Sequence, residues 1–209
     1  MSAEPEPIAG STSGLLVLAS ASPTRAVLLR RAGVPFLQDP ASIDEGAAKA
    51  ELRRSGKDAL QAALELARRK AVVVAQRHPQ QLVLGADQLL ECEGQWFDKP
   101  GSWLQAREQL LRLSGRRHRL ATAAVLVRGE IVSWSVAQAP ELVMRSLSSD
   151  FIDAYLDAVG ARALSSVGAY QIEGLGVQLI DSFSGDFFAV LGLPILPLLA
   201  ALRREGVLP

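Results

Sequence analysis

Short apolar runs bounded by polar residues recur along the chain and predict strands, of which those at 15–19 and 82–86 are expected to be buried. They are expected at residues 15–19, 82–86, 120–127, 131–137 and 141–147, with a further glycine-rich strand region at 168–190. Arg128-Gly129-Glu130 separates two of these runs, and its glycine predicts a hairpin turn between them.

Other stretches carry apolar residues at helical spacing. In the clearest one, residues 59–75, a single stripe contains Leu60, Leu64, Ala67, Ala71 and Val74. Further helices are expected at about 22–32, 102–113, 150–159 and 194–205, the first capped by Ser22 before Pro23 and the third by Ser149-Asp150. Strands and helices alternate only partly, which favours an α/β fold with a mixed central sheet flanked by helices.

The sequence contains no repeat or internal linker, so residues 15–209 are expected to form a single domain. Residues 1–14 are polar and rich in Pro, Gly and Ser, which predicts a flexible tail. They lack the apolar stretch of a secretory signal, and the apolar run at 190–201 is broken by glycine and proline. We therefore expect a cytoplasmic protein.

The charges of the 209-residue chain balance, with 22 Lys and Arg against 22 Asp and Glu. Proteins that bind nucleic acid or an anionic membrane surface normally carry a basic excess, so neither partner is expected. One cysteine and two histidines do not suffice for a typical sulfur or nitrogen metal site. Any bound metal should therefore be a hard ion held by carboxylates.

Ser20, Ser22 and Arg25 lie where the first predicted strand meets a helix N-terminus. The first N–H groups of a helix have no partner within it and carry partial positive charge, so such an end binds phosphate readily. In the alternative interpretation Ser22 is only an N-cap and Arg25 is a solvated side chain.

Asp87 directly follows the predicted strand at 82–86, so we expect it at a strand end, where it could orient a water or hold a divalent cation. Glu45, Lys70 and Lys99 are further candidates, although solvated charges are the alternative for each. Two like charges 4 Å apart repel by about 4 kcal/mol at an effective dielectric constant near 20. Carboxylates facing a triphosphate would therefore need Mg²⁺ or Mn²⁺ between them, with Lys and Arg neutralising the rest.

The string LASASPTRAVLLRRAGVPF at residues 18–36 resembles the opening motif of the Maf family. The likeness continues in order along residues 15–205, which makes it specific although each piece is short. Its further segments are Ile43-Asp44-Glu45, Leu66-Ala67 with Lys70-Ala71, Gly85-Ala86-Asp87, Lys99-Pro100, Leu113-Ser114-Gly115 with His118, Gly168-Ala169-Tyr170 and Gly192-Leu193-Pro194.

This resemblance implies a nucleoside triphosphate pyrophosphatase that uses Mg²⁺ or Mn²⁺ and cleaves between the α- and β-phosphates. It also implies an α/β fold with a cleft between two lobes, related to inosine triphosphate pyrophosphatases, and a homodimer. Clearing of non-standard nucleotides and arrest of cell division are the roles linked to the family.

The resemblance makes Asp87 the proton acceptor that activates water, with Glu45 beside it in the metal environment. Ser20 and Arg25 would hold the phosphates, while Lys70 and Lys99 would balance their charge. The residues implied to bind substrate are Ser20, Ser22, Arg25, Lys70, Lys99, Gln88 and Glu173.

Three positions depart from the usual family pattern. Thr24 replaces the first of two arginines, Gln88 replaces a threonine after the aspartate, and Glu173 replaces a glutamine in the tail motif. The Gln88 and Glu173 forms resemble the branch that acts on 7-methyl-GTP rather than on dTTP and UTP. A carboxylate near the base would favour the positively charged methylated guanine.

Two other functions stay open. Because one arginine is missing at Thr24, the chain could be a nucleotide-binding regulator of cell division without turnover. A hydrolase of another type using the same acids would release orthophosphate instead of pyrophosphate.

Overall fold

The computed structural model describes residues 15–209, so the tail predicted at 1–14 lies outside the described residues. The contacts between residues divide the chain into two compact units. Unit 1 contains residues 15–88, 122–138 and 192–209, and unit 2 contains residues 89–121 and 139–191. Each unit is assembled from separate stretches of the chain. The expectation of a single domain over residues 15–209 stays a prediction.

The strands of unit 1 pair in both directions. β1 (Leu16–Leu18) runs parallel to β2 (Phe36–Gln38) and to β3 (Leu82–Cys92). β5 (Arg117–Arg128) lies next to β3 and pairs antiparallel with β6 (Ile131–Gln138), which confirms the predicted hairpin and the mixed sheet. β3 and β5 both continue into unit 2.

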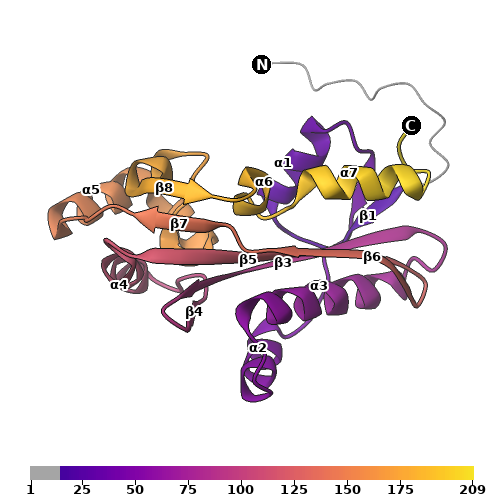
Figure 1. The fold of residues 1–209 in the computed structure, drawn as a ribbon, viewed down its shortest axis with the longest axis horizontal. Coiled ribbons are helices and arrows are strands. Elements are labelled where there is room, and N and C mark those ends of the chain that lie inside the picture. The colour runs from indigo at the N-terminus through magenta and orange to yellow at the C-terminus, as the bar shows by residue number, and fades with distance from the viewer. Residues whose placement is uncertain (1–14) are drawn as a thin grey trace. The chain divides into compact units, whose positions relative to one another are not determined.

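Helices cover both faces of the unit 1 strands. α1 (Pro23–Arg31) and α7 (Ile195–Arg204) lie on one side, and α3 (Ala59–Ala75) lies on the other (Figure 1). α2 (Glu45–Arg54) packs against α3. The helical expectations near 22–32, 59–75 and 194–205 are therefore confirmed.

α3 lies very close to β3. A methyl group added to Gly85 of β3 would come within 2.1 Å of the Ala67 carbonyl oxygen and 2.9 Å of Ala71 Cβ. Only a residue without a side chain allows the helix backbone to approach a strand so closely. The side of α3 that is most buried contains the small residues Ala63, Ala67 and Ala71, whereas Leu60 and Leu64 of the predicted stripe are half-buried.

Unit 2 has its own antiparallel strands. β4 (Gln95–Phe97) pairs with β3, β7 (Glu141–Met144) pairs with β5, and β8 (Ile180–Ser184) pairs with β7. α4 (Trp103–Leu113), α5 (Ser149–Val159) and the short α6 (Phe187–Val190) complete it, together with three 3₁₀ turns. Its apolar core includes Leu110, Leu142, Ile152 and Tyr170.

Several expectations about elements were wrong. Residues 168–190 do not form a strand region, because η2 (Val167–Ala169) and η3 (Leu175–Leu179) precede β8 and α6 follows it. Gly168, with a φ of 75°, bends the backbone out of any extended path. The cap of α5 is Ser148, whose side chain accepts from the Phe151 amide, rather than the Ser149-Asp150 pair.

Over residues 15–209, each helix is either too short or too polar to cross a lipid bilayer.

Candidate functional site

Lys70 of α3 sits between two carboxylates in unit 1. Its ammonium nitrogen lies 2.5 Å from Asp87 Oδ1 and 2.6 Å from Glu45 Oε1. Lys70 is 7% exposed and Asp87 is 4% exposed, so most of this charge has been removed from water. Such removal costs several kcal/mol per ion and is tolerated only with close, opposite partners. Two of the predicted acids and one predicted lysine are therefore brought together.

Asp87 does not lie at a strand end, as the sequence led us to expect. β3 continues through it to Cys92, because the apolar pattern resumes at Leu89 and Leu90 and the strand then pairs with β4. Gly85 and Asp87 are two residues apart and so face the same side of the strand, toward α3. The close approach at Gly85 thereby brings Lys70 within reach of Asp87.

The second carboxylate oxygen of Asp87 is unsatisfied. Oδ2 is buried and has no hydrogen-bond partner among residues 15–209. Buried acceptors are normally paired, and one that is not marks a place for a water, an ion or a catalytic proton transfer. Lys70 occupies Oδ1 alone, which leaves Oδ2 available to such a group.

Glu45 reaches Lys70 from the first turn of α2. Asp44 is the N-cap of that helix, and its Oδ1 accepts from the Ala47 amide at 2.9 Å. This cap fixes the start of α2 and therefore the position of Glu45, its first residue. A carboxylate in the first turn is also favoured by the helix dipole. The Glu45 side chain is 47% exposed, so solvent reaches the outer edge of the charged group.

Arg25 is buried and bonded to three separate segments. Its Nε donates to the Gly192 carbonyl at 2.8 Å, and its Nη1 donates to Ser20 Oγ and to the Ala86 carbonyl at 3.0 Å each. Burial lowers the pKa of Arg25, while the charges of Asp87 and Glu45 act in the opposite direction. The alternative of a solvated Arg25 is therefore wrong.

Arg25 still has donors to offer a ligand. Its Nη2 has no hydrogen-bond partner among the described residues, whereas the other guanidinium nitrogens are engaged. Because Ala86 immediately precedes Asp87, the bond to its carbonyl also fixes the backbone that carries the buried acid. Arg25 therefore combines a structural contact with a donor that can meet an anion.

The two serines differ in role. Ser22 is the N-cap of α1, with its Oγ accepting from the Arg25 amide at 3.4 Å, as the sequence predicts. Ser20 is 6% exposed, and its Oγ accepts from the Ser22 amide at 3.3 Å and from Arg25. Both hydroxyls thus help to shape the start of α1 beside Arg25.

Gln88 lies next to Asp87 but on the opposite face of β3, because neighbouring strand residues alternate. Its Nε2 donates to Oγ1 of the fully buried Thr122 on β5 at 2.8 Å. Its Oε1 lies 3.7 Å from where a Cβ would stand on Gly192. Sequence reasoning gave no role to Thr122, since a threonine in an apolar strand carries no distinct signal.

Lys99 and Glu173 belong to unit 2 and are both exposed. Lys99 lies between β4 and α4, and Glu173 lies in the turn before η3. Their substrate-binding roles stay predictions.

The carboxylates suit a hard divalent ion of the kind predicted. Mg²⁺ is commonly held by one or two carboxylates together with substrate phosphates, and the carboxylates of Glu45 and Asp87 fit that pattern. No group of three or more His, Cys, Asp or Glu residues capable of holding a metal occurs between residues 15 and 209. The ion would therefore depend on the substrate for much of its coordination.

Comparison with known proteins identifies the family of the chain. The model of the family described as Maf-like protein matches residues 15–205. The chain belongs to this family. The Maf-like chain is 47% identical over 192 residues to a nucleoside triphosphate pyrophosphatase of Paramagnetospirillum magneticum, covering 92% of this chain and 99% of the relative. It is 48% identical over 193 residues to a 7-methyl-GTP pyrophosphatase of Rhizobium etli, covering 92% and 97%.

The Maf family match confirms the resemblance seen in the sequence over the same residues, 15–205. In this Maf-like chain the opening motif supplies Ser20 and Arg25, and the segment Gly85-Ala86-Asp87 supplies the carbonyl that Arg25 binds and the buried acid. The structure brings these motifs together with Glu45, Lys70 and Gly192 within unit 1.

Proposed function

We propose that this Maf-like protein is a nucleoside triphosphate pyrophosphatase. It hydrolyses the bond between the α- and β-phosphates and releases a nucleoside monophosphate and pyrophosphate. The observation that carries this proposal is the buried Asp87 carboxylate, which is paired with Lys70 on one oxygen and unsatisfied on the other. Relatives that are 47% and 48% identical over 92% of the chain carry pyrophosphatase names.

Asp87 is suited to act as the proton acceptor. Its Oδ2 takes a proton from water as the water oxygen bonds to phosphorus, and the bond to the leaving phosphate oxygen breaks. Lys70 fixes the orientation of the carboxylate through its bond to Oδ1. A general base must be directed at the water before the step, and this contact meets that need.

Arg25 and the start of α1 are suited to hold the phosphates. The free Nη2 of Arg25 can donate to a phosphate oxygen, and the helix N-terminus adds unpaired N–H groups. Ser20 holds the guanidinium in place through Nη1. Lys99 of unit 2 is assigned to the phosphates only by the family motif.

A divalent cation, Mg²⁺ or Mn²⁺, is part of the proposal. Glu45 and Asp87 would hold it, and when bound it would neutralise phosphate charge. Lys70 contacts both of these carboxylates and so keeps them near each other when no other cation is present.

The preferred base is proposed to be 7-methylguanine. Gln88 and Glu173 carry this proposal, because they match the branch that acts on 7-methyl-GTP. The relatives alone do not choose between the two printed names, since their identities to this chain are 47% and 48%. A cytoplasmic location, a homodimer and roles in nucleotide clearing or division arrest stay predictions from the sequence.

The test is a panel of triphosphates, 7-methyl-GTP, dTTP, UTP and CTP, with Mg²⁺ or Mn²⁺ and both phosphate products measured. We expect monophosphate and pyrophosphate in equal amounts, fastest with 7-methyl-GTP. Release of orthophosphate would indicate another hydrolase type. Tight binding without product would favour the nucleotide-binding regulator. A similar rate for every base would contradict the proposed specificity but not the reaction.

A further inference from the structure

α2 carries Glu45 to the site but is packed only lightly by apolar side chains. Of its ten residues, Ala48 and Leu52 are the two buried ones. A short helix with so little buried apolar surface gains little from packing, and such segments open easily. Other contacts must therefore contribute to fixing where Glu45 lies.

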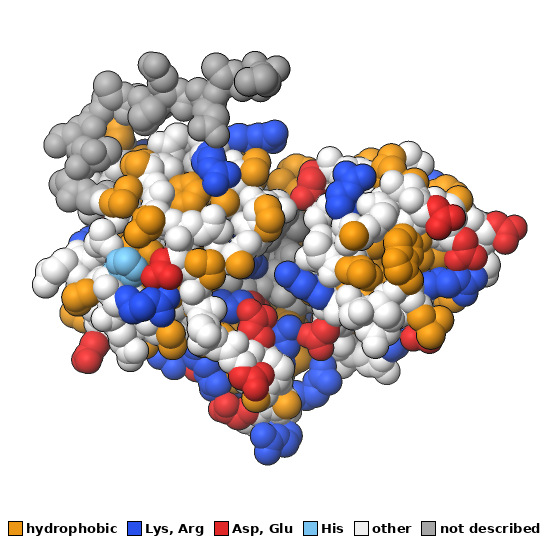
Figure 2. Space-filling view, turned by 180° about the vertical axis from the view of Figure 1, so that it is seen from behind, with side chains coloured by type: hydrophobic (Ala, Val, Ile, Leu, Met, Phe, Trp, Pro, Cys, Tyr) orange, Lys and Arg blue, Asp and Glu red, His pale blue; other side chains and the backbone are white. Residues whose placement is uncertain are grey.

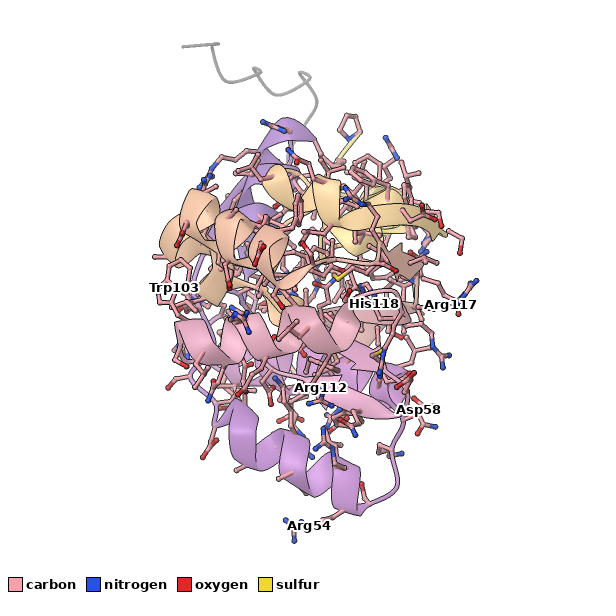
Figure 3. The ribbon with its side chains drawn as sticks, turned by 90° about the vertical axis from the view of Figure 1, so that its left-hand side faces the viewer. Arg54, Asp58, Trp103, Arg112, Arg117 and His118 are labelled. Carbon is pink, nitrogen blue, oxygen red and sulfur yellow. The ribbon has the colours of Figure 1, made fainter. Side chains whose placement is uncertain are left out.

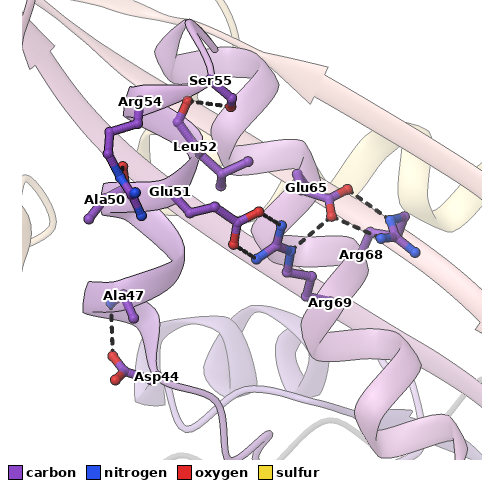
Figure 4. Close-up of polar contacts among 10 residues, drawn as sticks. All are labelled: Asp44, Ala47, Ala50, Glu51, Leu52, Arg54, Ser55, Glu65, Arg68 and Arg69. Atoms are coloured by element: carbon purple, nitrogen blue, oxygen red, sulfur yellow. Dashed lines mark hydrogen bonds and ion pairs between the residues drawn. The ribbon is translucent and has the colours of Figure 1, made fainter.

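One such contact joins the later part of α2 to α3. Glu51 accepts two hydrogen bonds from Arg69, from Nη1 to Oε2 and from Nη2 to Oε1, both at 2.9 Å (Figure 4). The remaining guanidinium nitrogen of Arg69 is also bonded, because its Nε donates to Glu65 Oε1 at 2.9 Å. Arg69 is thus aligned by its own helix before it meets Glu51.

This pair is directly linked in sequence to the proposed catalytic centre. Arg69 holds Glu51, and the next residue of α3, Lys70, holds Glu45. Glu45 and Glu51 are six residues apart, which separates them by about 9 Å along the helix axis. Two ion pairs that far apart fix the direction of the α2 axis against α3. A single ion pair at the first residue of α2 would leave the helix free to pivot about that point.

Side-chain packing does not fill the space around the pair. An open groove of about 530 Å³ between α2 and α3 is lined by Glu51 and Arg69 together with apolar residues such as Ala47 and Val72. A second groove, of about 430 Å³, also has Glu51 and Arg69 in its wall. The ion pair therefore bridges a groove between the two helices.

We propose that Glu51 and Arg69 are positioning residues, whose ion pair holds α2 against α3 so that Glu45 stays on Lys70. The catalytic consequence of this proposal rests on the proposed function, because it matters only if Glu45 takes part in the reaction. Neither residue touches the reacting groups. Their effect reaches the site through the orientation of α2.

The test compares Glu51→Gln and Arg69→Gln with the matched control Arg68→Gln. Arg68 bonds to Glu65 of its own helix through Nε and Nη2, at 2.8 Å each, so the control breaks a similar exposed pair and leaves the bonds of Arg69 to Glu65 and Glu51 in place. Hydrogen–deuterium exchange is measured for the amides of residues 47–55, and pyrophosphate release is measured in parallel.

We expect amide exchange in α2 to become about 2- to 5-fold faster in Glu51→Gln and Arg69→Gln, and to stay at the wild-type rate in Arg68→Gln. Because exposed ion pairs are screened by salt, high ionic strength should speed α2 exchange in wild type and bring it toward Glu51→Gln. Pyrophosphate release should fall by a similar factor, with thermal unfolding matching that of Arg68→Gln.

Unchanged exchange in the two variants would overturn the proposal. Faster exchange with an unchanged rate of release would also overturn it, because Glu45 would then not need the pair. If wild type released no pyrophosphate, the proposed function would fail, while the exchange data would still decide whether the pair holds α2.

Discussion

Lys70 is the residue on which the proposed centre depends, because it faces carboxylates from two different elements. Its ammonium group contacts Asp87 from β3 and Glu45 from α2. Neither acid is near Lys70 in sequence, so the chain must fold correctly before the charges are neutralised. The stability of unit 1 and the chemistry of the site are therefore coupled at this residue.

Replacing Lys70 with methionine should lower the free energy of unfolding by about 3–5 kcal/mol, because Asp87 is left as a buried charge without its partner. Urea denaturation followed by circular dichroism measures the change. The double variant Lys70→Met/Asp87→Leu should recover much of the loss, since no buried charge remains. A single variant as stable as wild type would show that the pair is not buried as described.

The sequence could predict part of this centre but not its contacts. Ser22 as an N-cap followed from local chemistry, since an N-cap needs only the residues next to it. The engagement of Arg25 with Gly192 and Ala86 could not be foreseen, because spacing along a chain does not show which distant carbonyls a buried guanidinium will meet. The family motifs include these segments but do not show which atoms of them are in contact.

Gly85 controls the distance between β3 and α3. Its Cα faces backbone atoms of the helix, and a Cβ there would lie 2.8 Å from the Ala71 amide nitrogen. Ala71 follows Lys70 directly, so any displacement of the helix at this point also displaces the lysine. The spacing of these two elements thus sets the contact between Lys70 and Asp87.

Gly85→Ala should destabilise the protein by about 1–3 kcal/mol and slow pyrophosphate release, because α3 must move away from the strand. The control is Gly46→Ala, whose Cβ would meet Asp44 Oδ1 at an ordinary 3.5 Å. Unfolding in urea and the rate of release are compared for both variants. Full stability and activity in Gly85→Ala would mean that the close approach has no role in the site.

Helices and strands with a wide apolar face could be predicted from the sequence, and those with few buried residues could not. α3 was predicted with its observed bounds, since it combines a wide apolar face with a capping box formed by Asp58 and Gln61. α2 was missed, because two buried residues give no helical period. The strand continuing past Asp87 was missed for a related reason, since two polar residues interrupt its apolar run.

At the scale of the whole molecule the charges are mixed. On the face in Figure 2, basic and acidic side chains are interspersed rather than gathered into patches of one sign. This matches the zero net charge of the sequence. A long-range field does not attract an anionic substrate to such a surface, so the proposed function requires local groups, for which Arg25 and Lys70 are the candidates.

A buried histidine in unit 2 gives the whole protein a dependence on pH. His118 of β5 (Figure 3) is 1% exposed, and its Nε2 lies 2.7 Å from the Tyr170 hydroxyl oxygen. Burial lowers the pKa of His118 to about 4 from 6.5.

The free energy of unfolding should fall as the pH is lowered from about 6.5 to 4, because the unfolded chain binds a proton to His118 in that range and the folded chain does not. The full effect is about 3 kcal/mol. Urea unfolding followed by the fluorescence of Trp96 and Trp103 in unit 2 measures it. In His118→Gln this pH dependence should disappear, and an identical dependence in that variant would contradict the assignment.

The division into two units could not be predicted from composition. Unit 1 and unit 2 share β3 and β5, so their boundaries fall within strands, after Gln88 and before Thr122, where no linker composition marks them. Local sequence signals predict turns and caps, but a boundary inside a strand depends on contacts with distant segments.

The rate of pyrophosphate release by Asp87→Asn, compared with wild type on the same triphosphate with Mg²⁺, tests the central claim most directly. Asparagine fills the same space but cannot accept the proton, so the rate should fall by about 10²–10⁴-fold with the fold intact by circular dichroism. Asp153→Asn, which alters an exposed acid of unit 2, should keep the wild-type rate. Equal rates for Asp87→Asn and wild type would contradict the account.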